Sequence, residues 1–320
     1  MEKTNKKPVN QGDYFVSLAP HIRSDDTVSK IMLDVIIALV PAMIASVFFF
    51  GLRSILIIGV AVFFAVGTEY IFQRAAHKEI RIKDLSAVVT GILLAFNVPA
   101  SAPLWMVAFG SIFAIIIVKE CFGGIGGNFM NPALAARVVL MASWPNQMTD
   151  YINPDGVSAA TPLAIIKESG GEGLPALSKM IIGDIGGVIG ETCAIALILG
   201  GIYLIVRKVI DWKTPVIYIL TTAIVLAIFK IPFNILPYEI FGGGLLLGAF
   251  FMATDYSSSP MNSRGKLIFA IGCGVITAVI RAKGGLPEGV SYSILLMNVA
   301  TPLIDKLTRT EAYGPKKVQR

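Results

Sequence analysis

Long uncharged apolar stretches alternate with short polar stretches along most of this sequence. Ten apolar segments stand out, at residues 31–50, 54–72, 85–96, 104–118, 129–144, 181–206, 214–229, 240–254, 267–280 and 290–304. A helix that crosses a membrane needs about 20 residues, each adding about 1.5 Å of length. The pattern therefore predicts an all-α polytopic membrane protein with about ten transmembrane helices.

Several of these segments are too short to cross a membrane perpendicularly. The clearest is 85–96, which stops at Asn97-Val98-Pro99. Short segments interrupted by glycine and proline are typical of discontinuous helices around a central site in transporters. A short helix lengthened by its flanks is the alternative, and the sequence leaves both open.

An internal repeat divides the apolar segments into two groups of five. Gly91-Ile-Leu-Leu-Ala-Phe resembles the stretch that begins at Gly244, and 113–124 resembles 274–285. A basic residue followed by Gly-Gly closes each of the second pair, Lys119 in one and Arg281 in the other. An odd number of crossings per repeat predicts inverted orientation. Chance similarity between apolar stretches is the alternative.

Lysine and arginine are distributed unevenly between the polar pieces. With the N-terminus placed in the cytoplasm, 20 of them fall in inside pieces and 6 in outside pieces. This bias predicts cytoplasmic N- and C-termini, with the first apolar segment as an uncleaved anchor. The predicted parts are a cytoplasmic segment 1–30, a first transmembrane repeat 31–144, an extracytoplasmic loop 145–180, a second repeat 181–304 and a cytoplasmic tail 305–320.

The composition excludes several other classes of protein. Apolar residues make up 55% of the chain and charged residues 15%, with a mean hydropathy of +0.72. These values exclude an ordinary cytosolic enzyme and a disordered chain. The net charge of +6 does not indicate nucleic-acid binding, because the basic residues lie in short loops, as orientation signals do. The isolated cysteines and the two distant histidines, His21 and His77, predict no metal or iron–sulfur site.

A few acidic residues lie within or beside the apolar segments. Glu191 falls inside the sixth segment, and a carboxylate inside a membrane is a functional candidate by default. Asp34 and Glu69 lie near the predicted cytoplasmic ends, where they can instead snorkel or cap. Asp255 ends a segment, where it can terminate a helix or lie near an ion path. Glu191, Asp255 and Asp34 are the candidates for an ion path, with structural pairing as the alternative.

The glycine-rich stretch 123–128 does not match a phosphate-binding loop. A re-entrant or broken-helix turn is the prediction, with Asn131-Pro132 beginning the next helix.

The long polar loop contains the sequence Asp155-Gly156-Val157-Ser158-Ala159-Ala160-Thr161-Pro162. The Pro154-Asp155-Gly156 stretch predicts a turn, and Pro162 disfavours helical geometry at Thr161. The small neighbours predict an exposed Thr161 hydroxyl that can accept a bulky covalent group. An ordinary loop threonine is the alternative.

These stretches together resemble one family of membrane proteins. Residues 155–161 resemble the D-x-x-[S/T]-[G/A/S]-A-T motif at which flavin transferases attach FMN to threonine. Residues 19–24 with 31–41, 126–133 and 251–260 resemble the N-terminal signature, the G-x-N-x-x-N-P-A segment and the M-A-T-D-x-x-x-[ST]-P segment of that family. The family contains the D subunit of the Rnf electron transport complex and the B subunit of the sodium-pumping NADH:quinone reductase. The chain lacks the longer N-terminal region of the latter, and Tyr256 replaces a common proline.

The resemblance implies a covalent FMN on Thr161, with Asp155, Ser158 and Ala160 in the recognised motif. It implies a non-autonomous subunit of a ferredoxin:NAD+ oxidoreductase that moves Na+ or H+ across a prokaryotic cytoplasmic (inner) membrane. The FMN would relay electrons on the outer side. A second, noncovalent flavin such as riboflavin is compatible with the resemblance, but no residue is assigned to it.

The expected partners are the other Rnf subunits, including those that carry flavin or handle ferredoxin and NAD, a flavin transferase and membrane lipid. A small-solute channel or secondary transporter, and a quinone-reductase subunit, are the alternatives.

Overall fold

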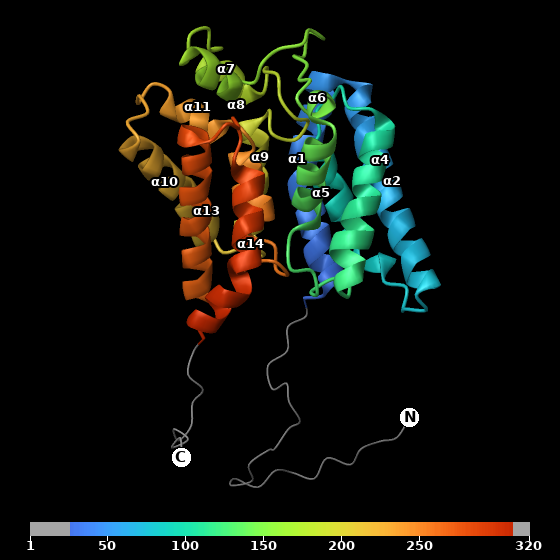
Figure 1. Cartoon of the computed structure of the whole chain (residues 1–320). Coiled ribbons are helices and arrows are strands. Elements are labelled where there is room, and N and C mark those ends of the chain that lie inside the picture. The colour runs from blue at the N-terminus through green and yellow to red at the C-terminus, as the bar shows by residue number, and fades with distance from the viewer. Residues whose placement is uncertain (1–25, 310–320) are drawn as a thin grey trace, which may run out of the picture.

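The computed structural model describes residues 26–309 as an almost entirely helical chain (Figure 1). The first half holds α1 (Val28–Phe50), α2 (Leu52–Ala75), the 3-10 turn η1 (Ile82–Asp84), α3 (Ser86–Phe96), α4 (Leu104–Phe113), its π-helical extension η2 (Ala114–Lys119), the 3-10 turn η3 (Glu120–Phe122) and α5 (Pro132–Ser143). The connection holds α6 (Pro145–Met148), α7 (Pro162–Ser169) and α8 (Leu177–Ile182). The second half holds α9 (Ala194–Val206), α10 (Lys213–Ile228), α11 (Leu236–Phe241), α12 (Leu245–Leu247), its π-helical extension η4 (Gly248–Met252), α13 (Ser263–Lys283) and α14 (Val290–Leu307).

The two halves lie side by side, and the described chain begins and ends on the same face (Figure 1). We call this face, where α1 begins and α14 ends, the terminal face. The opposite face carries residues 145–183, including α7 and α8, and we call it the loop face. The Ala19–Ser24 part of the N-terminal resemblance, with His21, lies outside the described residues.

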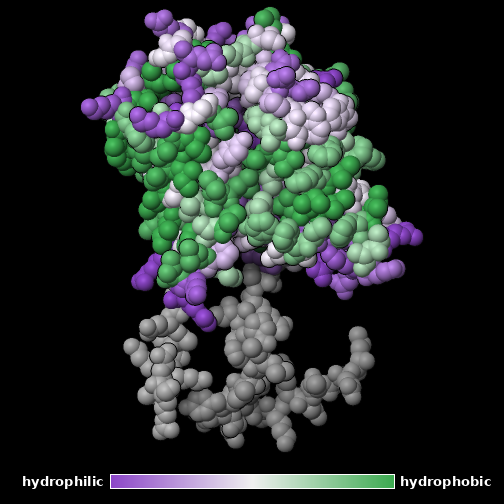
Figure 2. Space-filling model, viewed as in Figure 1, coloured by the Kyte–Doolittle hydropathy of each residue, from purple (hydrophilic) through white to green (hydrophobic). Residues whose placement is uncertain are grey.

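The helices have the lengths and surface of a protein that spans a membrane. Among residues 26–309, four helices are long and apolar enough to cross, namely α1, α2, the continuous 104–122 stretch and α13. Four shorter apolar helices, α3, α5, α9 and α10, accompany them. Figure 2 shows a broad apolar band between hydrophilic residues at both ends of the molecule. The prediction of an all-α polytopic membrane protein with short and broken helices is confirmed.

Contacts between the halves are symmetric. Helix α1 packs against α9, its counterpart in the second half, and α5 packs against α14. Helix α3 follows α2 from the terminal face, whereas α12 follows α11 from the loop face (Figure 1). The corresponding broken helices therefore enter from opposite sides, as inverted repeats require.

Local signals set several boundaries at the predicted positions. Helix α3 stops at Phe96, directly before Asn97. The Asn131 side chain accepts hydrogen bonds from the backbone N–H groups of Ala133 and Leu134 and so caps α5, which starts at Pro132. Gly51 joins α1 to α2 at a φ of 64°, a left-handed conformation that glycine adopts without strain.

The prediction of one helix across 181–206 is wrong. The chain is irregular between α8 and α9, and Glu191 lies in this stretch instead of inside a helix. The backbone N–H groups of Ile189 and Gly190 donate to the carbonyls of Val98 and Phe96, at 3.2 and 3.1 Å. The Arg53 guanidinium donates to the carbonyls of Ala100 and Ala102, at 3.2 and 3.1 Å. These donors satisfy the carbonyls that the break after α3 leaves free.

The break after η4 is held by α14. The Asn298 amide donates to the Ser258 carbonyl at 2.9 Å, and its oxygen accepts from the Asn131 N–H at 3.2 Å. Two of the segments that carry the family resemblance therefore meet at Asn298. The ends of the two broken helices also meet, because the Asn97 amide lies 3.8 Å from the Met252 sulfur.

Replacing Gly190 tests the pairing of the irregular stretch with the end of α3. A Cβ on Gly190 would lie 2.2 Å from the Phe96 Cβ, so Gly190→Ala must displace one of the two segments. We expect the free energy of unfolding to fall by about 1–3 kcal/mol. Thermal unfolding in detergent measures the change, with Gly285→Ala, whose Cβ meets nothing within 4 Å, as the control. Equal Tm values for the two variants would contradict the pairing.

Candidate functional site

Thr161 lies on the loop face, where the irregular chain enters α7. Its φ of −65° and ψ of 153° are extended, as the following proline predicts. Its hydroxyl oxygen accepts a hydrogen bond from the Ala164 N–H at 3.2 Å and so caps α7. The side chain is only 4% exposed, so the predicted open hydroxyl is wrong. Burial arises from tertiary packing, which the small neighbours Ala159 and Ala160 do not reveal.

The residues before Thr161 form a small projecting turn. Ile152 and Ser158 pair as an isolated bridge, and the Gly156 N–H donates to the Asn153 carbonyl at 2.8 Å. Asp155 and Ser158 are exposed, and the Ser158 hydroxyl donates to the Asp150 carboxylate at 3.1 Å. The predicted turn is confirmed, and it holds the acidic part of the motif away from the buried threonine.

Thr161 and Ala160 line a pocket of about 390 Å³. Its walls come from α5, the connection and the start of α14: Arg137, Val138, Met141, Thr149, Tyr151, Ala160, Thr161, Ala164, Glu168, Leu286, Pro287, Glu288, Ser291 and Tyr292. Small-molecule sites usually occupy ~300–1,000 Å³ and combine apolar walls with a few polar groups. The pocket therefore has the size and lining of a ligand site, and both halves of the chain contribute to it.

A buried charged network forms the floor of this pocket. The Arg137 guanidinium is ion-paired with Glu288 and donates to the Asn97 side-chain oxygen at 2.7 Å. The Tyr151 hydroxyl donates to the same Glu288 carboxylate at 3.5 Å. Burial and the Glu288 charge raise the pKa of Tyr151, which lies outside the spanning helices, so this phenol stays protonated.

Glu191 approaches this network from the irregular stretch before α9. Its side chain is buried at 6% exposure, and one carboxylate oxygen accepts from the Val188 N–H at 3.4 Å. The other oxygen has no hydrogen-bond partner. A Cβ added to Gly244 would lie 3.1 Å from that oxygen, so the free oxygen faces the start of α12.

Asp255 lies in the break after η4, on the terminal-face side of the molecule. Its carboxylate accepts from the Ser258 hydroxyl at 2.8 Å and, more weakly, from Ser257. It lines two cavities, of about 80 and 700 Å³. The structure therefore does not bring Asp255 together with Glu191 or Thr161 in one pocket.

Asp34 takes part in a contact between the repeats. It accepts from the Tyr203 hydroxyl at 2.9 Å and forms a 3.1 Å ion pair with Arg207, both near the end of α9. Glu69 is 1% exposed and forms a 2.7 Å ion pair with Lys119. The snorkelling alternative for Glu69 is therefore wrong, because a snorkelling side chain reaches water.

Sequence reasoning did not identify the main partners at the loop-face pocket. Tyr151 and Glu288 carry no sequence signal of their own, and Arg137 stands out only as a charge within an apolar segment. That arginine was the available signal, because a charge in such a segment needs a buried partner. Among residues 26–309, no group of three or more His, Cys, Asp or Glu side chains is placed to hold a metal ion.

Comparisons with known proteins match nearly the whole chain. The model of the NQR2, RnfD, RnfE family matches residues 15–314. The chain is 49% identical to the D subunit of the Na+-translocating ferredoxin:NAD+ oxidoreductase complex of Acetobacterium woodii, over 98% of this chain and 99% of the relative. It is 44% identical to the D subunit of the proton-translocating ferredoxin:NAD+ oxidoreductase complex of Clostridium ljungdahlii, over 97% and 98%. It is 32% identical to the D subunit of the ion-translocating oxidoreductase complex of Aliivibrio salmonicida, over 95% and 99%.

Replacing Arg137 tests the network beneath the pocket. Arg137→Gln leaves the buried Glu288 carboxylate without its counter-charge, and removing one partner of a buried ion pair costs about 3–5 kcal/mol. We expect a clear fall in Tm, measured by thermal unfolding in detergent. The control is Arg81→Gln, because the Arg81–Glu79 pair is exposed and such pairs contribute only about 0–1 kcal/mol. A smaller fall for Arg137→Gln than for the control would contradict the network.

Proposed function

Because this chain belongs to the NQR2, RnfD, RnfE family, we propose that it is the D subunit of an ion-translocating ferredoxin:NAD+ oxidoreductase complex, the Rnf complex. Relatives of this name match over almost their full length, at 49% and 44% identity. The activity belongs to the assembled complex, so the other Rnf subunits are obligatory partners. Full-length similarity to these relatives favours this function over a solute channel.

Thr161 is the attachment point for a covalent FMN in this proposal, joined through a phosphoester. The observation that carries it is the position of Thr161, which both caps α7 and lines the loop-face pocket. The N-terminus of a helix presents backbone N–H groups and the positive end of its dipole, which suit a phosphate. When bound, FMN supplies one-electron transfer, and the chain supplies its position and surroundings.

The pocket fits such a group in both size and chemistry. Met141, Leu286 and Tyr292 offer apolar and aromatic surface for a flat ring, while Arg137 and Tyr151 offer hydrogen-bond donors. The exposed Asp155 and Ser158 are available for a flavin transferase to recognise, with Ala160 next to the acceptor. Because Thr161 is buried, the transferase must act while α7 or the preceding turn is displaced.

The charge distribution supports an orientation in a prokaryotic cytoplasmic membrane. In this proposal the terminal face is cytoplasmic, with N- and C-termini inside, and the loop face with its flavin lies outside. The apolar band of Figure 2 would contact lipid. The transported ion is Na+ or H+, since relatives are named for each. A noncovalent flavin such as riboflavin stays part of the proposal, with no residue assigned to it.

Glu191 and Asp255 are the proposed members of the ion path. The free oxygen of Glu191 supports its assignment at the loop-face end, and the cavities around Asp255 support one at the terminal-face end. Asp34 is the weaker member, because Arg207 and Tyr203 already satisfy its carboxylate.

Attachment of FMN can be measured directly. We expect the chain, expressed with a flavin transferase, to fluoresce under ultraviolet light on a denaturing gel, and Thr161→Ala to abolish the signal. Thr149→Ala is the matched control, because Thr149 lines the same pocket and its hydroxyl donates only to nearby carbonyls. Fluorescence that survives Thr161→Ala would sink the attachment site.

The Glu191 assignment is tested in the assembled complex in liposomes. Glu191→Gln keeps the shape of the side chain but removes its charge, so we expect ion transport per transferred electron to fall severalfold. Glu172→Gln, an exposed change on the same face, is the control. Transport by Glu191→Gln that equals the control, with normal assembly, would remove Glu191 from the path.

A further inference from the structure

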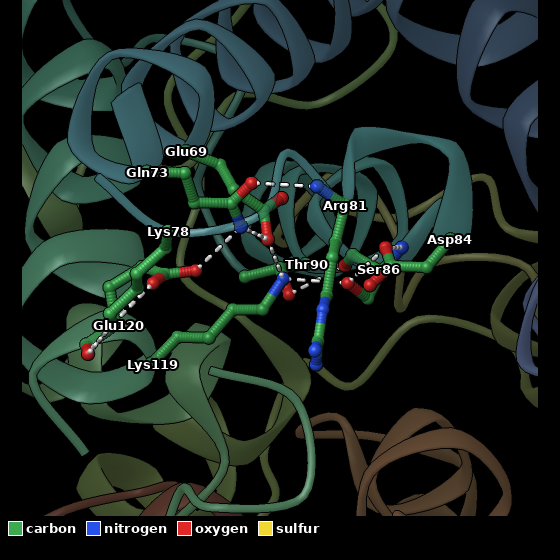
Figure 3. Close-up of polar contacts among 9 residues, drawn as sticks. All are labelled: Glu69, Gln73, Lys78, Arg81, Asp84, Ser86, Thr90, Lys119 and Glu120. Atoms are coloured by element: carbon green, nitrogen blue, oxygen red, sulfur yellow. Dashed lines mark hydrogen bonds and ion pairs between the residues drawn. The ribbon is translucent and has the colours of Figure 1, made fainter. Parts of the chain in front are cut away.

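A second buried charged cluster lies at the terminal-face end of the first repeat (Figure 3). The Lys119 ammonium, at the end of η2, donates to one Glu69 oxygen at 2.7 Å and to the Ser86 hydroxyl at 2.6 Å. Glu69 and Lys119 have side chains that are only 1% and 4% exposed. The Ser86 hydroxyl donates in turn to Asp84 at 2.6 Å. This ion pair therefore joins α2 and η2 to the start of α3.

The cluster continues from Glu69 toward the terminal face. The Gln73 amide donates to Glu69 at 3.2 Å and to Glu120 at 3.0 Å, and Lys78 forms a 3.3 Å ion pair with Glu120. The half-exposed Lys78 connects the chain of contacts to water. Glu69, Glu120 and Asp84 thus face Lys119 and Lys78, which leaves the cluster one negative charge in excess.

One oxygen of Glu69 has no partner. Among residues 26–309, three buried side-chain atoms lack a hydrogen bond: Glu69 Oε2, Glu191 Oε2 and Arg281 Nε. A buried carboxylate oxygen without a donor is costly unless something binds it. Glu69 is one of the residues lining a cavity of about 200 Å³, together with Gln73, Glu120 and the exposed Glu79 and Arg81. A polar opening from the terminal face therefore leads to this carboxylate.

The ion pair lies between two cavities. Glu69 lines the polar one, and Lys119 lines the 80 Å³ cavity that also contains Thr254 and Asp255 from the second repeat. Ile125 borders both. An ion that enters from the terminal face would therefore meet Glu69 first, with Lys119 between it and Asp255.

The second repeat provides an internal comparison. Arg281, the counterpart of Lys119, is ion-paired with Glu239 at 3.2 Å and donates to the carbonyls of Gly242 and Gly243. One guanidinium there faces one carboxylate, and arginine stays charged in proteins. Lysine instead is a flexible point charge whose ammonium can leave its partner. The Arg281 pair is therefore a fixed anchor, whereas the Lys119 pair has a spare carboxylate oxygen and a movable cation.

We propose that Glu69 accepts the transported monovalent cation, Na+ or a proton, from the terminal-face cavity, and that Lys119 is the tethered counter-cation that it displaces. Binding at the free Glu69 oxygen neutralises the carboxylate and weakens its attraction for the Lys119 ammonium. No group of three or more metal-ligating side chains lies in the described chain, so the site suits a singly charged ion. The inference rests on the proposed ion translocation and adds an entry site to it.

The test uses the complete complex in liposomes, with electron transfer from ferredoxin to NAD+ and ion uptake measured together. Glu69→Gln should raise the Na+ or H+ concentration for half-maximal transport by about tenfold or more, which corresponds to losing one charge-assisted contact. Lys119→Met should lower it, because the competing ammonium is gone. Na+ titration at fixed pH and pH titration without Na+ distinguish the two ions.

The opposite signs separate this role from a structural one. If the pair only positions α3, both variants impair assembly and neither changes the ion dependence in the predicted direction, and the inference is overturned. Glu79→Gln, which removes an exposed carboxylate at the rim of the same cavity, should match the wild type. If Glu69→Gln alone does not assemble, the double variant Glu69→Gln/Lys119→Met decides: restored assembly with an unchanged ion dependence overturns the site.

The proposed function can fail separately. A wild-type complex that transfers electrons but moves neither ion contradicts ion translocation itself. A wild-type complex that moves an ion with the same concentration dependence as Glu69→Gln contradicts only the entry site.

Discussion

Backbone that is not helical must find hydrogen-bond partners inside the protein wherever a membrane excludes water. This chain has two such stretches, one after α3 and one after η4, and much of the fold supplies their partners. The irregular stretch before α9 donates to the carbonyls of Phe96 and Val98, and Arg53 serves those further along. Asn298 performs the same task for the second break. The exchange of partners between the repeats ties the two halves into one structure.

The broken helices also explain where the buried charges lie. The C-terminal ends of α3 and η4 meet near Asn97 and Met252, so the negative ends of two helix dipoles face one another. Arg137 donates to Asn97 and offsets this concentration of negative charge. The starts of the same helices are held by Lys119 and Arg281. The basic residues that interrupt the apolar pattern are therefore placed at the ends of two short helices.

The sequence predicted those features that depend on local chemistry, such as the end of α3 at Asn97 and the cap at Asn131. The break before α9 was missed because hydropathy measures side chains and not backbone partners, which lie about 90 residues earlier. The buried sites depend on contacts between distant segments, since Thr161 is enclosed by α5 and α14, and Glu69 meets Lys119 across 50 residues. An acidic residue in an apolar segment identifies a candidate, but only its partners separate a fixed pair from a free carboxylate.

Helix α3 places the two candidate sites in one mechanical unit. Its first residue, Ser86, contacts Lys119, and the residue after its last turn, Asn97, contacts Arg137 in the wall of the Thr161 pocket. A helix of 11 residues is rigid along its axis, and it is buried on nearly every side. Movement of the Lys119 ammonium would therefore act on the same element that positions Arg137. The geometry connects a cation site on one face with a flavin pocket on the other without requiring any residue to cross the membrane.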